Sequence, residues 1–252
     1  MIRADLHVHT VFSDGKSTPE EYVNAALTMG MTRLGFSDHS YTPFDESYCI
    51  PRARVQEYRD CIAGLKEKYA GRLDILCGIE QDLYSGRPTE KYDYVIGSVH
   101  YLKLGDEYVP VDESPDILRG AAERFFGGDM YALAAEYYRT VAQVADCTGC
   151  DIIGHFDLTA KFCERTALLD ESDRRYTECA EAAALSLIKT GLPFEINTGA
   201  VSRGHRSEPY PSLRLIDFIK DNGGRFILSS DSHCADTLCG HFGEYEMYVH
   251  DR

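Results

Sequence analysis

The chain has 252 residues, of which 44% are hydrophobic and 27% charged, a composition typical of globular proteins. Its formal net charge of −15 argues against nucleic acid as a standing partner, because clustered lysines and arginines bind the phosphate backbone. No apolar run approaches the roughly 18–20 residues that span a bilayer, and no signal region opens the chain. We therefore expect a cytoplasmic protein without a membrane partner.

Short β-prone runs alternate with longer helical patterns along the chain. The predicted strands cover residues 2–9, 33–38, 73–79, 94–99, 151–154, 192–197 and 225–230. The first predicted helix begins at Thr18, with Pro19 in its first position, and ends near Gly30. The other predicted helices cover residues 54–69, 130–146, 172–190 and 211–222. This alternation indicates βα units, and the lack of a linker or repeat predicts one α/β domain over residues 1–252.

Each predicted strand delivers a polar side chain at or near its C-terminal end. In chain order these are His7 and His9, then His39, Glu80, His100, His155, Glu195 with Asn197, and finally Asp231 with His233. In a parallel barrel the carboxyl ends of the strands converge on one face. Six of the nine histidines occupy such positions, which independent structural histidines would not do. His205, His241 and His250 are the exceptions, and we expect them at the surface or rim.

The convergent residues predict a metal site. The candidate ligands are His7, His9, Asp14, His39, Glu80, His100, His155, Asp231 and His233. A mixture of imidazole and carboxylate without cysteine suits Zn, Mn or Fe(II) at a hydrolytic site better than a closed structural zinc site. At about three to four protein ligands per catalytic ion, the set predicts two or three divalent ions. Ions about 3.5–4 Å apart, bridged by a carboxylate, typically serve phosphate-ester hydrolysis.

The order of these motifs resembles the polymerase and histidinol phosphatase (PHP) family. The similarity runs from Asp5 to His233 and implies a distorted seven-stranded (β/α)7 TIM-like barrel. It implies three metal positions: His7, His9, Glu80 and Asp231 for the first; Glu80, His100 and His155 for the second, with Glu80 bridging; His39 and His233 for the third. Asp14 departs from the pattern, because some family members have a histidine as the further third-metal ligand.

Within the family, the chain is most similar to stand-alone L-histidinol-phosphate phosphatases, in segments 154–162, 195–199 and 229–233. The resemblance implies a phosphomonoesterase of histidine biosynthesis that releases L-histidinol and phosphate. We expect a hydroxide that bridges two metals to attack phosphorus. Glu80, Asp231 and His233 are the expected catalytic residues. Asp231, His233 or a metal-bound water would protonate the leaving alcohol, and the sequence does not choose among them.

The loops after the strand ends suggest how a substrate would bind. Arg203, Lys161 and Arg165 follow the fifth and sixth predicted strands, and we expect them to contact phosphate. Two loops at 41–48 and 101–113 are rich in acidic residues and tyrosine, which would suit the ammonium and imidazole of histidinol phosphate.

Two alternatives remain at this point. The chain could be a PHP phosphoesterase for a nucleotide or another small phosphate ester, or a non-catalytic metal-binding PHP module. The retained ligand set favours an enzyme whose partner is a small phosphate ester. No heptad or apolar stripe predicts an oligomer, so the oligomeric state stays open.

Overall fold

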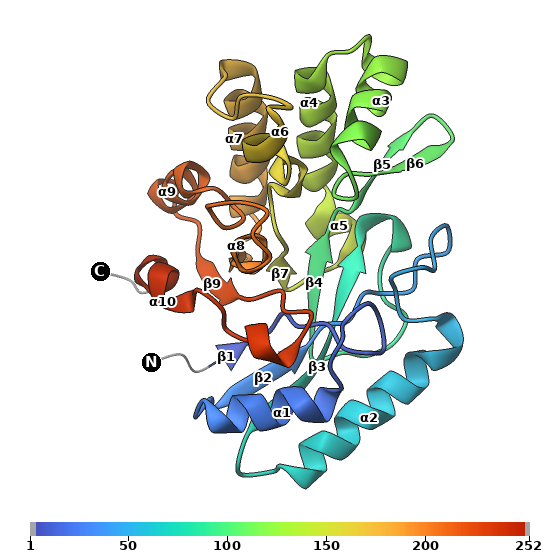
Figure 1. Cartoon of the computed structure of the whole chain (residues 1–252), viewed down its shortest axis with the longest axis vertical. Coiled ribbons are helices and arrows are strands. Elements are labelled where there is room, and N and C mark those ends of the chain that lie inside the picture. The colour runs from blue at the N-terminus through green and yellow to red at the C-terminus, as the bar shows by residue number, and fades with distance from the viewer. Residues whose placement is uncertain (1–3, 250–252) are drawn as a thin grey trace.

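The computed structural model describes residues 4–249, in which seven parallel strands form one sheet (Figure 1). In spatial order the strands are β1 (Ala4–Asp5), β2 (Arg33–Phe36), β3 (Asp74–Asp82), β4 (Tyr94–Ser98), β7 (Ile152–Ile153), β8 (Phe194–Asn197) and β9 (Phe226–Ser229). Beyond the first and last strands, Val8 pairs in parallel with Ser232. The sheet therefore curls into a nearly closed barrel, which confirms the predicted fold class.

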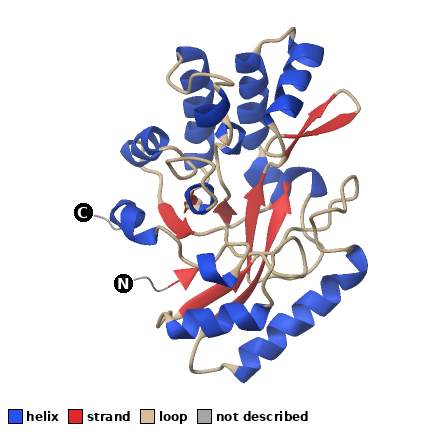
Figure 2. Cartoon of the chain, in the orientation of Figure 1, coloured by secondary structure: helices blue, strands red, loops and turns tan. Residues whose placement is uncertain are grey.

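Helices surround the strands (Figure 2). They are α1 (Pro19–Thr28), α2 (Val55–Lys68), α3 (Pro115–Phe126), α4 (Met130–Val141), α5 (Val144–Thr148), α6 (Cys163–Thr166), α7 (Arg174–Ile188), α8 (Gly199–Ser202), α9 (Leu213–Asp221) and α10 (Phe242–Tyr245). Single 3-10 turns occupy Arg52–Arg54, Leu83–Ser85, Leu158–Ala160, Ala235–Thr237 and Glu246–Tyr248. In Figure 1, α3, α4 and α7 gather at one end of the molecule, and α1 and α2 lie at the other.

The start of α1 shows how local sequence fixes an element. The Thr18 hydroxyl accepts a hydrogen bond from the Glu21 amide, and the Glu21 carboxylate accepts one from the Thr18 amide at 2.7 Å. This capping box satisfies amides that the helix itself leaves unpaired. The helix then buries Tyr22, Val23 and Ala26 against the barrel. The predicted helix start is confirmed.

All seven predicted strands are present, but four predictions of helices and strands need correction. The expected helix at 130–146 is broken into α4 and α5 at Ala142 and Gln143, where neither glycine nor proline marks the break. The hairpin of β5 (Tyr101–Leu104) and β6 (Glu107–Pro110) was not predicted, and neither was α3. The first strand is also shorter than expected, because only Ala4 and Asp5 pair along β2.

The described range leaves out a few residues at each end of the chain. The predicted strand residues 2 and 3, and His250, lie outside it. Between residues 4 and 249, no helix is both long and apolar enough to cross a membrane. All nine cysteines of the chain are free thiols.

Candidate metal centre

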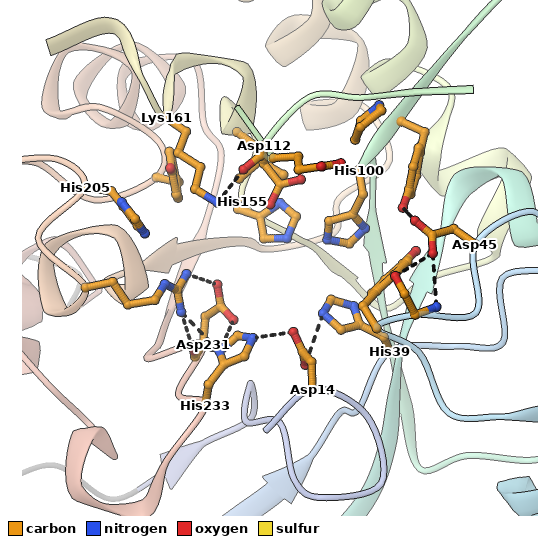
Figure 3. A pocket seen from close by; sticks show the side chains of 18 residues that line it. Asp14, His39, Asp45, His100, Asp112, His155, Lys161, His205, Asp231 and His233 are labelled. Atoms are coloured by element: carbon orange, nitrogen blue, oxygen red, sulfur yellow. Dashed lines mark hydrogen bonds and ion pairs between the residues drawn. The ribbon is translucent and has the colours of Figure 1, made fainter. Parts of the chain in front are cut away.

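The C-terminal ends of the strands bring imidazoles and carboxylates to one mouth of the barrel. His7 and His9 follow β1, Glu80 lies on β3, and His100 follows β4. All four side chains are buried. Figure 3 shows residues from other strand ends and loops around the same cavity: Asp14, His39, His100, His155, Asp231 and His233.

Glu80 lies at the middle of this group and uses its two oxygens differently. Its Oε1 lies 2.8 Å from His155 Nε2 and 3.3 Å from His100 Nε2. Its Oε2 lies 3.2 Å from His7 Nε2 and 2.9 Å from His39 Nδ1. One carboxylate therefore faces two separate sets of imidazoles, which is the arrangement of a bridging ligand.

Asp14 faces a third set of imidazoles. Its Oδ2 lies 3.1 Å from His233 Nε2, and its Oδ1 lies 3.7 Å from both His9 Nδ1 and His39 Nε2. The loop that carries Asp14 is fixed by a backbone hydrogen bond from the Lys16 amide to the His233 carbonyl, at 2.7 Å. The structure thus brings the residue that departs from the family pattern together with the histidines of the expected third metal position.

Several buried polar atoms at the site lack hydrogen-bond partners in the described part of the chain, as expected for atoms that bind metal ions. His7 Nε2, both ring nitrogens of His9 and Glu80 Oε2 have no hydrogen-bond partner although each is shielded from solvent. Leaving such groups unsatisfied costs roughly 1–3 kcal/mol each. Donor atoms within 4.8 Å of one another form three groups: His9, Asp14, His39 and His233; His7, His9 and Glu80; His39, Glu80 and His100. The donor set fits several divalent ions.

Electrostatics favours the metal-binding form of Glu80 and His9, whereas nearby carboxylates, against the effect of burial, raise the pKa of His7 and His100, which must each lose a proton to bind a metal. Burial by itself would raise the pKa of Glu80, but His39, His7 and His100 hold that pKa well below its ordinary value. Burial and two neighbouring imidazoles lower the pKa of His9 to about 3. Glu80 is therefore an ionised carboxylate and His9 a neutral imidazole near neutral pH, as coordination requires.

Glu195 has a supporting role that the sequence prediction did not assign to it. Its Oε2 lies 2.8 Å from His7 Nδ1, and its other oxygen accepts a hydrogen bond from the His155 amide. Ser229 and Asn197 donate to the same carboxylate, at 2.7 and 3.0 Å. With Nδ1 engaged, the Nε2 of His7 is directed at Glu80. Histidines that bind metals often hydrogen-bond to a carboxylate through their other ring nitrogen. The position of Glu195 at the end of a predicted strand could have indicated this role from the sequence.

Asp231 is held from two sides. Arg203 donates from Nη2 to Asp231 Oδ2 at 2.9 Å and from Nη1 to the Asp231 carbonyl at 2.7 Å. Asn197 Nδ2 also lies 3.3 Å from the same carboxylate oxygen. The other oxygen, Oδ1, remains directed at His9 Nε2, 3.2 Å away. Arg203 therefore orients Asp231 while it borders the cavity.

The cavity at the barrel mouth has a volume of about 370 Å³. Lys161 lies at its edge, but its Nζ donates to the carbonyl of Asp112 at 2.7 Å and approaches the carboxylate at 3.2 Å. Arg165 is not among the residues that line the cavity, and its guanidinium donates to the Gly204 carbonyl. His205, which we expected at the rim, does line it. Of the three predicted phosphate-binding residues, the structure brings Arg203 and Lys161 to the cavity.

The opposite wall of the cavity is acidic and aromatic. Asp45 accepts hydrogen bonds from the Tyr101 hydroxyl at 2.7 Å and from the Ser47 hydroxyl at 2.6 Å. Phe44 and Tyr108 stack with ring centroids 3.8 Å apart, which joins the 41–48 loop to the β5–β6 hairpin. Figure 3 places Lys161 and His205 on one side of the cavity and Asp45 on the other. The side opposite Lys161 therefore presents the carboxylate of Asp45, whereas Lys161 and Arg203 are paired with Asp112 and Asp231.

Imidazoles and carboxylates gathered at the strand ends of a barrel are typical of metal-dependent hydrolases. The chain belongs to the PHP family, because the PHP domain matches residues 5–199. This confirms the resemblance seen in the sequence.

Curated relatives cover nearly the whole chain. A probable histidinol-phosphatase of Deinococcus radiodurans is 33% identical over 260 residues, which covers 98% of this chain and 92% of the relative. A histidinol-phosphatase of Bacillus subtilis is 24% identical and covers 94% of this chain and 96% of the relative.

Solved structures share the fold. One from Listeria monocytogenes has a TM-score of 0.82 at 19% identity, and the match covers 96% of this chain and all of that one. The histidinol phosphate phosphatase of Lactococcus lactis, complexed with Zn, L-histidinol and phosphate, has a TM-score of 0.74 at 21% identity, covering 98% and 92%. At these identities the likeness shows the fold.

Proposed function

We propose that this chain hydrolyses L-histidinol phosphate to L-histidinol and phosphate as a metal-dependent phosphomonoesterase. The observation that carries the proposal is the position of Glu80 between two sets of imidazoles, beside a cavity lined by both basic and acidic side chains. The names of the curated relatives support the choice of substrate.

The proposed ligands divide among two or three Zn, Mn or Fe ions. One ion would be held by His7, His9, Glu80 and Asp231; a second by Glu80, His100 and His155; a third by Asp14, His39 and His233. When bound, such ions activate water and neutralise the charge of phosphoryl oxygens.

The chain's own residues have three tasks in this proposal. Glu195 holds the His7 ring so that Nε2 faces Glu80. Arg203 fixes Asp231, and its position at the cavity lets the guanidinium neutralise a phosphoryl oxygen as charge develops there. Asp231 and His233 both lie at the cavity, but Arg203, against the effect of burial, holds the pKa of Asp231 well below its usual range, so His233 or a water would pass the proton to the leaving alcohol.

The carboxylates that line the cavity favour histidinol phosphate over a nucleotide. The dianionic phosphate would face the metals and Arg203, while Asp45 and Glu113 would face the ammonium and imidazole at the other end of the substrate. Asp112 is partly neutralised by Lys161, so Asp45 and Glu113 supply most of the uncompensated negative charge. A nucleotide would bring no cation to this wall.

Phosphate release tests the proposal. Protein loaded with Mn or Zn is assayed with histidinol phosphate, p-nitrophenyl phosphate and a nucleoside bisphosphate, and chelated protein is the control. We expect a marked preference for histidinol phosphate, which metal removal abolishes and metal addition restores. Release from the nucleotide alone would assign a different substrate, and no release from any ester would favour a non-catalytic metal-binding module.

We also place the protein in the cytoplasm. The nine free thiols support this location, because reduced cysteines are usual in a reducing compartment. Its proposed partner is the small phosphate ester itself.

A further inference from the structure

Tyr210 is a buried cavity residue whose hydroxyl has no hydrogen-bond partner among residues 4–249. Its side chain is only 1% exposed, yet it belongs to the cavity lining together with His155, Lys161 and Arg203. An unsatisfied buried hydroxyl lowers stability, and it offers both a donor and an acceptor to a ligand. The metal positions proposed above do not use it.

The backbone fixes where this hydroxyl lies. Tyr210 exchanges two hydrogen bonds with Asn197 at the end of β8: the Asn197 amide donates to the Tyr210 carbonyl at 2.7 Å, and the Tyr210 amide donates back at 2.9 Å. The ring meets His155 edge-on, with centroids 6.4 Å apart. The ring is therefore held next to a proposed metal ligand on the side of the cavity that carries Arg203.

A competing role for the hydroxyl lies behind the cavity, where Arg206 is 5.7 Å from the Tyr210 ring centroid. Arg206 already donates to the Ala160 carbonyl at 2.6 Å and pairs with both oxygens of Glu171 at 3.0 Å. Its Nε and the Oδ1 of Asp157 have no hydrogen bonds. A structural role for the Tyr210 hydroxyl would involve this cluster.

We propose that Tyr210 is a substrate-binding residue whose hydroxyl donates a hydrogen bond to a phosphoryl oxygen of the bound ester. The inference rests on the proposed function. A phosphate dianion presents more acceptor sites than Arg203 alone can fill, and a hydrogen bond to a charged acceptor is stronger than a neutral one. The tyrosine would select the phosphoryl group, whatever alcohol it is attached to.

The test is the variant Tyr210→Phe, which removes the hydroxyl and keeps the ring. Inorganic phosphate serves as a competitive inhibitor of the metal-loaded enzyme and as the titrant in calorimetry. We expect phosphate to bind about tenfold more weakly or worse, which is the usual effect of losing a hydrogen bond to a charged group. Because the hydroxyl has no partner among the residues that the structure describes, the melting temperature should stay the same or rise.

Tyr138→Phe is the matched control, because Tyr138 is equally buried but donates its hydroxyl to Tyr176 at 2.6 Å and does not line the cavity. This control should lower the melting temperature and leave phosphate affinity unchanged. If Tyr210→Phe behaves like the control in an active enzyme, Tyr210 belongs to the Arg206 cluster and the inference is wrong. If the wild-type protein hydrolyses no ester, the proposed function fails instead.

Discussion

The two sides of the cavity are built by different means. On the metal-facing side, His7, Glu80 and Asp231 lie on strands or within two residues of a strand end, and His9 follows Val8, which pairs in parallel with Ser232. The substrate-facing side is formed by the 41–48 loop, the β5–β6 hairpin and the loops after β7 and β8. These segments are joined mainly by side-chain contacts.

The two sides therefore have different tasks: the metal-facing side supplies the groups for hydrolysis, and the substrate-facing side supplies the groups that select the substrate. The metal-facing groups are buried at the strand ends, and several of their donor atoms, including both ring nitrogens of His9 and Glu80 Oε2, have no hydrogen-bond partner among the described residues. The loop carboxylates have partners within the chain: Asp112 forms an ion pair with Lys161, and Asp45 accepts a hydrogen bond from the neutral Tyr101 hydroxyl. Rigid elements position the reacting groups, and adjustable loops hold the groups that distinguish substrates.

Glu80→Gln should have the largest effect, because it removes the charge that two sets of imidazoles share. We expect kcat to fall by several orders of magnitude and metal content to fall with it, measured by phosphate release and elemental analysis. Glu123→Gln, an exposed change on α3, is the control and should change neither. Full rate and full metal content in Glu80→Gln would show that the metal-facing side does not drive the chemistry.

Glu195→Gln should have the next largest effect, since it weakens the support of His7 without removing a metal ligand. Loss of such a partner typically lowers metal affinity or activity by about 10–100-fold. We expect a lower kcat at saturating metal and a weaker metal affinity in titrations. An unchanged metal affinity and rate would mean that strand geometry alone orients His7.

Asp112→Asn tests the substrate-facing side. It removes a negative charge from the wall and releases Lys161 from its partner. We expect KM for histidinol phosphate to rise several-fold, while KM for p-nitrophenyl phosphate, which has no cationic group, stays the same or falls. Asp116→Asn on the surface of α3 is the control. Equal changes for both substrates would remove the distinction between the two sides.

Thr18→Ala should have the smallest functional effect, because the α1 capping box lies away from the cavity lining. Loss of the cap should lower the free energy of unfolding by about 1 kcal/mol. Denaturant unfolding measures this loss, and kcat and KM should match those of the wild type. A large loss of activity would show that α1 helps to position the metal-facing loop.

The strands and the candidate ligands could be predicted because both depend on local sequence. A strand of a parallel barrel is a short apolar run, and its polar end residue lies at a fixed place relative to the barrel mouth. His7, His9, Glu80 and His155 could therefore be placed near one another before any contact between them was known. The start of α1 was predictable for the same reason, because its cap lies within four residues.

Only the tertiary structure decided the contacts between distant segments. Glu195 reaches His7 across 188 positions, and Lys161 meets Asp112 across 49. Arg165 resembled a phosphate ligand in the sequence, but its loop turns the guanidinium toward Gly204. Such contacts depend on loop conformation and side-chain packing, which the local pattern of hydrophobic and polar residues does not predict. The sequence thus determined which chemistry is possible at the barrel mouth, and the packing of the loops decided which charges face a substrate.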